Sequence, residues 1–100
     1  MANLQKESKR YEPFLYWWDI TPRRANDLDK YDTVEFIKKD TGKSCIVPTE
    51  KLRKFLTNTR QTTRGEGNWG IRVLLDHPNE LAFEPGTADG DWLFLPVVWE

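Results

Sequence analysis

Alternating hydrophobic and polar positions, typical of β-strands, recur along most of this sequence. The alternation predicts strands over residues 31–39, 43–47, 69–75 and 81–84. Residues 11–18 are apolar on both faces, so we expect this strand to be central or covered on both sides. The hydrophobic segment 92–99 predicts a last strand, and Pro96 places it at a sheet edge or a bulge because proline cannot donate to the ladder.

A turn and a helix interrupt this pattern in the middle of the chain. Asp40-Thr41-Gly42 has the composition of a tight turn, so residues 31–47 are predicted to form a hairpin. The helix begins at Pro48-Thr49-Glu50, with Thr49 as its expected N-cap. Its apolar stripe consists of Leu52, Phe55 and Leu56, spaced as on one face of a helix.

The remaining segments are expected to connect these elements. Residues 19–30 contain Thr21-Pro22 and several charged side chains, which predicts an irregular connection. Residues 57–68 and 85–91 are polar and contain glycine, which is typical of loops. We therefore expect an α+β fold with a mainly antiparallel sheet of about five to six strands and one principal amphipathic helix.

Length and composition limit the organisation to one small domain over residues 1–100, with residues 1–10 expected to be a flexible N-terminal segment. A hydrophobic content of 38% and an aromatic content of 13% are enough for one core. No apolar run reaches the roughly 20 residues that a membrane helix needs, so no membrane association is expected. The single cysteine, Cys45, excludes an internal disulfide framework. Together these features favour a cytoplasmic location.

The formal net charge of −1 hides a difference between the two halves of the chain. Residues 1–64 carry a formal charge of +5, and residues 65–100 carry −6. Either the halves neutralise each other across the fold, or they form surfaces of opposite charge that attract different partners.

The sequence offers few residues for catalysis or metal binding, and it predicts no cofactor. Cys45 lies in a predicted strand, which favours an ordinary buried thiol, and His77 precedes Pro78 in a turn, which favours a solvated loop residue over a general base. Acidic residues cluster at 27–32 and at Asp89 and Asp91, without the spacing of a calcium loop. A metal-dependent hydrolase that uses Asp32 or Asp89 is the third-ranked alternative.

Basic residues on the predicted helix favour nucleic acid as the partner. The apolar stripe of the helix directs its other side chains outward, where they can contact phosphates. The expected nucleic-acid-binding residues lie on this helix, after it and in the earlier connection: Arg23, Arg24, Lys51, Arg53, Lys54, Arg60 and Arg64.

A protein partner is the second alternative, in which the chain acts as an adaptor or inhibitor. Its acidic second half suits a basic partner, and Trp69 and Trp92 flank the two predicted loops. Tryptophan beside a loop is a favoured anchor of protein interfaces. An apolar edge strand over 92–99 also permits a homodimer by strand pairing.

Residues 31–56 resemble the distal part of restriction-endonuclease-like (PD-(D/E)xK) nuclease domains. The similarity consists of a Tyr-Asp-Thr-Val-Glu-Phe-Ile strand, a Thr-Gly-Lys turn and a Cys-Ile-Val-Pro step into a helix. Glu7-Ser8-Lys9 is similar to the E-x-K half of the family motif. Nothing upstream of Glu7 supplies the family's first helix, first core strand or metal-binding Asp, so Glu7 and Lys9 are not assigned as catalytic. The resemblance implies a nuclease-like remnant, a partial domain or a module completed by dimerisation, and we rank non-catalytic binding first.

Overall fold

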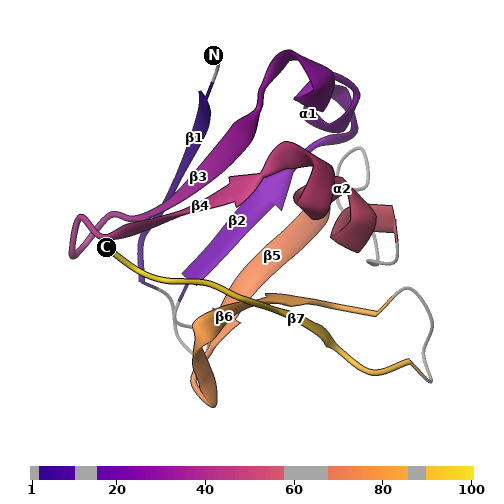
Figure 1. Ribbon diagram of the computed structural model, residues 1–100. Coiled ribbons are helices and arrows are strands. Elements are labelled where there is room, and N and C mark those ends of the chain that lie inside the picture. Colours follow the sequence, from indigo (N-terminus) through magenta and orange to yellow (C-terminus); the bar gives the residue numbers. More distant parts are fainter. Residues whose placement is uncertain (1–2, 11–15, 58–67, 86–89) are drawn as a thin grey trace.

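The described residues form two β-sheets and two short α-helices, an α+β fold as predicted (Figure 1). The computed structural model describes residues 3–10, 16–57, 68–85 and 90–100. One sheet has three strands, in the order β1 (Asn3–Ser8), β3 (Thr33–Lys38) and β4 (Ser44–Pro48). The other has four strands, in the order β2 (Tyr16–Ile20), β5 (Trp69–Leu74), β6 (His77–Phe83) and β7 (Leu93–Pro96). Strands β1 and β3 pair in parallel and the other pairs are antiparallel, so the mainly antiparallel prediction is confirmed.

The predicted hairpin and the principal helix are both present. Strands β3 and β4 pair in register from Thr33 opposite Pro48 to Ile37 opposite Ser44, and Gly42 in their turn has a φ of 76°, which favours glycine. Helix α2 (Thr49–Thr57) follows β4 directly and buries Leu52 and Leu56. Thr49 does not act as the expected cap: it is the first helical residue, and its buried Oγ1 has no hydrogen-bond partner within the described part of the chain.

The N-terminal segment differs from the expected flexible segment, because Asn3–Ser8 form β1 at the edge of the three-stranded sheet. Polar side chains attach this strand to its neighbours: Asn3 and Gln5 donate to the Glu35 carboxylate at 3.1 and 3.0 Å, and Ser44 donates at 2.6 Å. The hydrogen bonds from Ser44, Gln5 and Asn3 hold the pKa of Glu35 below its ordinary value. Local patterning did not predict this strand, because its pairing depends on polar contacts with a distant segment.

The connection 19–30 also differs from the irregular segment that was expected. It contains helix α1 (Pro22–Asn26) and a short 3-10 helix, η1 (Leu28–Lys30). Thr21 accepts a hydrogen bond from the Arg24 amide at 3.1 Å, and Pro22 is the first helical residue. Threonine at the N-cap followed by proline is a favoured helix start, so Thr21-Pro22 begins a helix here instead of only interrupting a strand.

The strand predictions hold for the four-stranded sheet with three differences. The described part of the predicted strand 11–18 begins at Tyr16, and β2 lies at a sheet edge instead of in the centre, with one face buried. Strand β6 begins at His77 instead of residue 81, because the turn uses Leu75 and Asp76, and a register shift lies between Arg72 and Leu74. Strand β7 is an edge strand, as Pro96 predicted.

The core lies between the two sheets and is centred on Trp18, which is 2% exposed. The Trp18 ring packs edge-on against Phe36 of the other sheet at 5.3 Å, and it stacks on Tyr16 and Trp99 at 5.8 and 6.1 Å between centroids. Helix α2 contributes Phe55, whose ring lies 4.9 Å from that of Phe83. Aromatic side chains from both sheets therefore form one continuous core.

The C-terminal segment joins the two sheets at the end of the molecule opposite the helices (Figure 1). The backbones of Ser44 and Glu100 exchange two hydrogen bonds, of 3.0 and 2.9 Å. Beside them, the Lys38 ammonium lies 4.0 Å from the centroid of the Trp99 ring and 5.3 Å from that of Tyr16. We call this group of Tyr16, Lys38, Ser44, Trp99 and Glu100 the seam.

Within the described residues, no helix is long and apolar enough to cross a membrane.

Candidate functional site

Four of the seven basic residues predicted to bind nucleic acid lie on the two helices at one end of the molecule: Arg23, Arg24, Arg53 and Lys54. Helix α2 meets η1 through an ion pair in which the Arg53 guanidinium lies 2.7 Å from Asp29. Helices α1 and α2 lie at the same end of the fold (Figure 1), and Arg23 of α1 and Lys54 of α2 are both exposed. We call this surface the helical face and define it by its basic residues, Arg23, Arg24, Lys30, Arg53 and Lys54.

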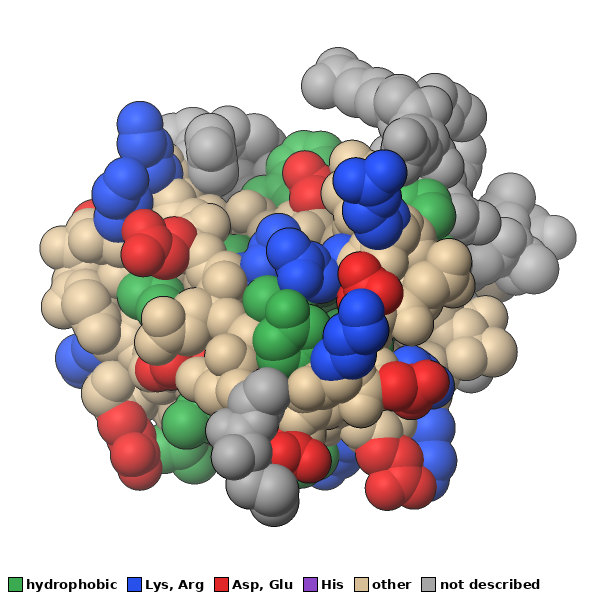
Figure 2. Space-filling view, turned by 90° about the horizontal axis from the view of Figure 1, so that it is seen from above, with side chains coloured by type: hydrophobic (Ala, Val, Ile, Leu, Met, Phe, Trp, Pro, Cys, Tyr) green, Lys and Arg blue, Asp and Glu red, His purple; other side chains and the backbone are tan. Residues whose placement is uncertain are grey.

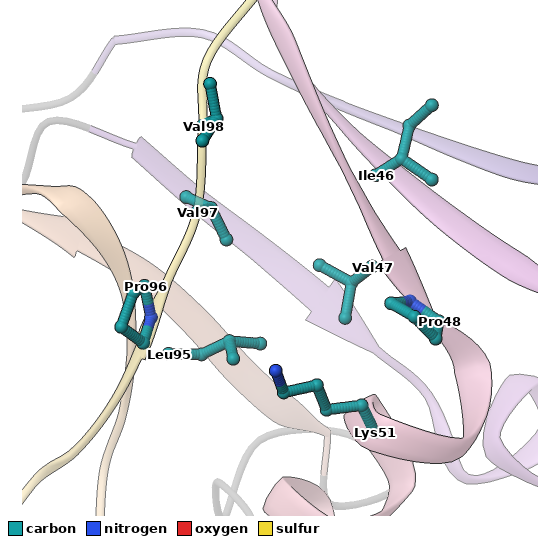
Figure 3. Close-up of a pocket in the computed structure, with 8 residues that line it drawn as sticks. All are labelled: Ile46, Val47, Pro48, Lys51, Leu95, Pro96, Val97 and Val98. Atoms are coloured by element: carbon teal, nitrogen blue, oxygen red, sulfur yellow. The ribbon is translucent and has the colours of Figure 1, made fainter.

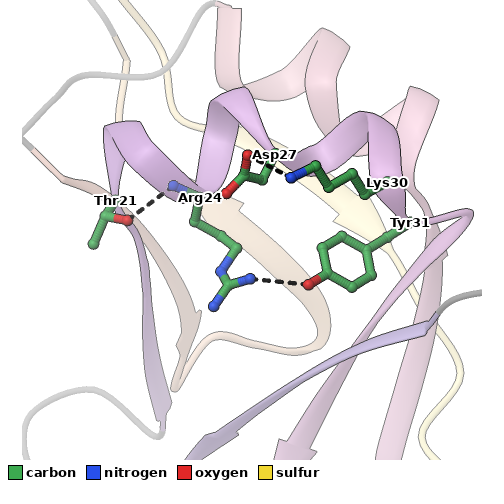
Figure 4. Close-up of polar contacts among 5 residues, drawn as sticks. All are labelled: Thr21, Arg24, Asp27, Lys30 and Tyr31. Carbon is green, nitrogen blue, oxygen red and sulfur yellow. Dashed lines mark hydrogen bonds and ion pairs between the residues drawn. The ribbon is translucent and has the colours of Figure 1, made fainter.

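Acidic side chains and internal contacts occupy part of the helical face. The Arg24 guanidinium donates a hydrogen bond of 3.0 Å to the Tyr31 hydroxyl, and Lys30 lies 3.5 Å from Asp27 (Figure 4). Helix α1, Asp27, η1 and α2 together still carry a formal charge of +3. Figure 2, viewed from above, shows Lys and Arg side chains with Asp and Glu side chains between them. The helical face is therefore moderately basic.

Lys51, Arg60 and Arg64 are not part of this surface as it is described. Lys51 is two positions from Arg53, about 200° around the helix, and its side chain points toward β7 instead (Figure 3). Arg60 and Arg64 lie outside the described residues. The sequence pattern correctly separated the apolar stripe of α2 from its charged side chains, but it did not divide those side chains between two surfaces.

Lys51 lines a small groove between β4, the start of α2 and the C-terminal segment (Figure 3). The groove encloses about 100 Å³, well below the roughly 300–1,000 Å³ of small-molecule sites. Its walls are apolar and include Ile46 and Val98, which are 61% and 73% exposed. A groove of this size holds at most one or two side chains of a partner.

The two tryptophans predicted to contact a protein lie on opposite faces of the four-stranded sheet. Trp69 is half-buried and packs against the core, opposite Ile20 in β2. Trp92 precedes β7, and its ring lies 5.3 Å from the guanidinium carbon of Arg72. Of the two, only Trp92 lies on the face turned away from the core.

That face, which we call the outer sheet face, also carries residues that the sequence did not point out as binding residues. The register places Trp17 opposite Arg72, Arg72 opposite Ala82, and Ala82 opposite Phe94, so these residues share one side of the sheet. The polar and aromatic residues that define it are Trp17, Arg72, Glu80, Glu84, Trp92 and Phe94. One signal was present in the sequence: Arg72 stands alone as a charged residue between Ile71 and Val73.

Arg72 is held between two tryptophan rings. Its guanidinium carbon lies 4.4 Å from the Trp17 centroid and 5.3 Å from that of Trp92, and its Nη1 lies 3.5 Å from Glu84. Gly70 permits the close packing of Trp17, because a Cβ at this position would lie 2.8 Å from the indole nitrogen. The Trp17 indole in turn donates to Asp19 at 2.9 Å. The two tryptophan rings thus form a site for a planar cation, and the Arg72 guanidinium occupies it.

Cys45 is buried as the sequence favoured, whereas His77 is the first residue of β6 and not a solvated loop residue. The His77 ring stacks on Phe94 at 4.1 Å, and its Nδ1 lies 3.1 Å from Glu80. Cys45 is 3% exposed in β4, and burial raises the pKa of its thiol to about 12. The thiolate that acts as a nucleophile is therefore scarce at neutral pH.

The acidic clusters do not form a metal site in the part of the chain that the structure describes. No group of three or more His, Cys, Asp or Glu residues there is arranged to hold a metal ion. Asp29 pairs with Arg53 and Asp27 with Lys30, whereas Asp89 lies outside the described residues. Glu7, from the nuclease-like Glu-Ser-Lys sequence, is an exposed residue of β1.

The combined geometry presents two surfaces of different chemistry, a basic helical face and an aromatic and acidic outer sheet face. Comparison with known proteins adds no assignment to either: no family model, curated protein or solved structure matches the chain.

Proposed function

We propose that this chain is a non-catalytic module that binds nucleic acid through the helical face. The observation that carries the proposal is the ion pair between Arg53 of α2 and Asp29 of η1, the short helix that follows α1. Arg23 and Lys54 are exposed there, so their cationic groups can approach phosphates.

The charge balance of the helical face defines the kind of binding to expect. Asp27 and Asp29 offset two of its cations, which leaves a formal charge of +3 on the helices and the residue between them. Backbone contacts of this kind neutralise phosphates without reading bases. We therefore expect binding that does not depend on sequence, with a dissociation constant on the order of 10⁻⁵ M at physiological salt.

Salt titration of binding to a labelled duplex and to a labelled single strand tests this proposal. Four phosphate contacts on a duplex give a slope of about −3.6 in log K against log salt, so doubling the salt concentration weakens binding about tenfold. Reversing the charge in Arg23→Glu or Lys54→Glu should lower affinity for all sequences alike and make the slope shallower by about one. Arg53→Glu should likewise lower affinity for all sequences, because it also removes the pair with Asp29.

The matched control is Lys43→Glu, which changes net charge equally but lies in the β3–β4 turn, away from the helical face. It should retain affinity within about twofold, apart from the small effect of net charge. Salt-independent binding, no binding to DNA or RNA, or an equal loss in Lys43→Glu would contradict the proposal.

A further inference from the structure

The outer sheet face has the composition of a surface that recognises cations. Trp17, Trp92 and Phe94 are half-buried, and their rings already contact Arg72 or His77. Aromatic ring faces attract Lys and Arg side chains, and tryptophan does so most strongly. The stacking of Trp17 and Trp92 on Arg72 shows that this geometry already accommodates a guanidinium group.

Charge on this side of the sheet also favours a basic ligand. Arg72 is the only Lys or Arg in the four strands β2, β5, β6 and β7, and it lies beside Glu84. Glu80 lies in β6, and the exposed Asp19 and Asp91 lie in β2 and just before Trp92. These carboxylates repel phosphates, so the surface suits a basic peptide better than a nucleic acid.

The position of β7 adds a route for an extended chain. Strand β7 is the last strand of its sheet and, in the described residues, pairs only with β6. Val97 donates its backbone N–H to Asn79 of the β6 side, so by alternation the backbone N–H and C=O of Phe94 point away from β6. An extended segment can therefore pair with this edge while its side chains reach the outer sheet face.

We propose that the outer sheet face binds an extended basic segment of a partner protein. Lys or Arg side chains of that segment pack on Trp92 and pair with Asp91. They compete with His77 for Phe94 and Glu80, because His77 stacks on Phe94 and its Nδ1 lies 3.1 Å from Glu80. This surface is separate from the helical face, so the inference stands independently of nucleic-acid binding.

The test is titration of the full chain with a short peptide of alternating Arg and Ser, using a Glu and Ser peptide of equal length for comparison. Affinity is measured by fluorescence anisotropy of the labelled peptide, and the contact surface by two-dimensional NMR. We expect the basic peptide to shift the indole signal of Trp92 and the amide signals of Glu80 and Phe94, with little change at the buried Trp18. The acidic peptide should not bind.

Variants separate this surface from general charge attraction. Trp92→Ala and Glu80→Lys should each weaken peptide binding about tenfold, as expected for anchor residues. Glu7→Lys, which makes the same charge change as Glu80→Lys on the three-stranded sheet, should retain affinity within about twofold. Asp91→Lys alters an exposed side chain outside the strands, so it provides a second test if Trp92→Ala does not fold.

Unchanged affinity in both Glu80→Lys and Asp91→Lys would overturn the proposal, as would equal binding of the acidic peptide. Amide shifts confined to the helical face would also overturn it. So would NMR signals showing that a second copy of this chain, and not the peptide, occupies the outer sheet face. DNA binding should not weaken in Glu80→Lys, so failure of one proposal is distinguishable from failure of the other.

Discussion

The seam and the outer sheet face each hold a cation between two aromatic rings, but they connect different parts of the fold. Lys38 of β3 lies between Tyr16 of β2 and Trp99, so its rings and its own strand come from different sheets. Arg72 lies between Trp17 and Trp92, which belong to or adjoin its own sheet. The same interaction therefore joins two sheets in one place and covers one sheet in the other.

This difference predicts different consequences for stability. At the seam, loss of the Trp99 ring removes the contacts of the C-terminal segment with Trp18 and Lys38 and leaves the backbone hydrogen bonds between Glu100 and the hairpin residue Ser44. On the outer sheet face, the four strands remain paired through their backbones whether or not a ring covers Arg72. We expect the seam to control folding stability and the outer sheet face to control recognition.

The largest effect is expected from Trp99→Ala. This change removes the stack on Trp18, the contact with Lys38 and the indole hydrogen bond to the Pro78 carbonyl, which is 3.0 Å long. Because Trp99 is half-buried, we expect a loss of about 2–4 kcal/mol in the free energy of unfolding, measured by urea denaturation. Trp92→Ala is the matched control and should cost about 1 kcal/mol. Equal losses in the two variants would remove the distinction between the two regions.

A smaller effect is expected from Lys38→Met, which keeps the aliphatic stem and removes the charge. The cation–π contacts with Trp99 and Tyr16 are lost, and we expect a decrease of about 1 kcal/mol in the free energy of unfolding. The neighbouring Lys39→Met changes an exposed side chain and should stay within about 0.5 kcal/mol of the unmodified chain. The idea that Lys38 joins the sheets fails if the two variants are equally stable.

The smallest effect at neutral pH concerns the Tyr16 hydroxyl, which donates to Asp40 at 2.6 Å. Burial, with a further contribution from Asp40, raises the pKa of Tyr16 to about 12 from its ordinary 10.0. The stability that the neutral hydroxyl contributes is fully present below pH 10.0 and is lost as pH rises through about 12.

Titration of tyrosinate absorbance measures this directly. Tyr16 should ionise near pH 12. Asp40→Asn should lower the pKa of Tyr16, and Tyr16→Phe should remove the titration step near pH 12. If the step that Tyr16→Phe removes lies near pH 10 instead, the predicted environment of the seam is wrong.

The two halves of the chain differ in net charge, and part of this difference persists on the folded surface. Arg53 pairs with Asp29 and Arg72 with Glu84, in both cases within the same half. The first half supplies the helical face, and the second supplies most of the acidic residues around the outer sheet face. The halves therefore retain some of their separate charge in the fold.

Local sequence patterns predicted the elements whose signals lie within a few residues. The Asp40-Thr41-Gly42 turn, the Leu52 and Leu56 stripe and the edge position indicated by Pro96 were all correctly predicted. The N-terminal strand β1 was missed because its residues are mostly polar and its partner, β3, is about 30 residues away. Helix α1 was missed because Thr-Pro begins helices as well as interrupting strands.

The sequence predicted part of the helical face but little of the outer sheet face. The apolar stripe of α2 predicted that its charged side chains are exposed. Trp92 was selected as a binding candidate because it lies beside a predicted loop. The rest of the outer sheet face was not predicted, because Trp17, Arg72 and Phe94 come from three separate strands whose register no local pattern fixes.

The sequence by itself determined the α+β class, the β3–β4 hairpin and the two-sided character of α2. These features depend on backbone preferences and side-chain periodicity over short distances. Only the tertiary structure decided that the strands divide into two sheets, that Lys38 joins them, and that Arg72 lies between two tryptophans. These contacts depend on which distant segments meet, and that choice is made by burial of the shared aromatic core.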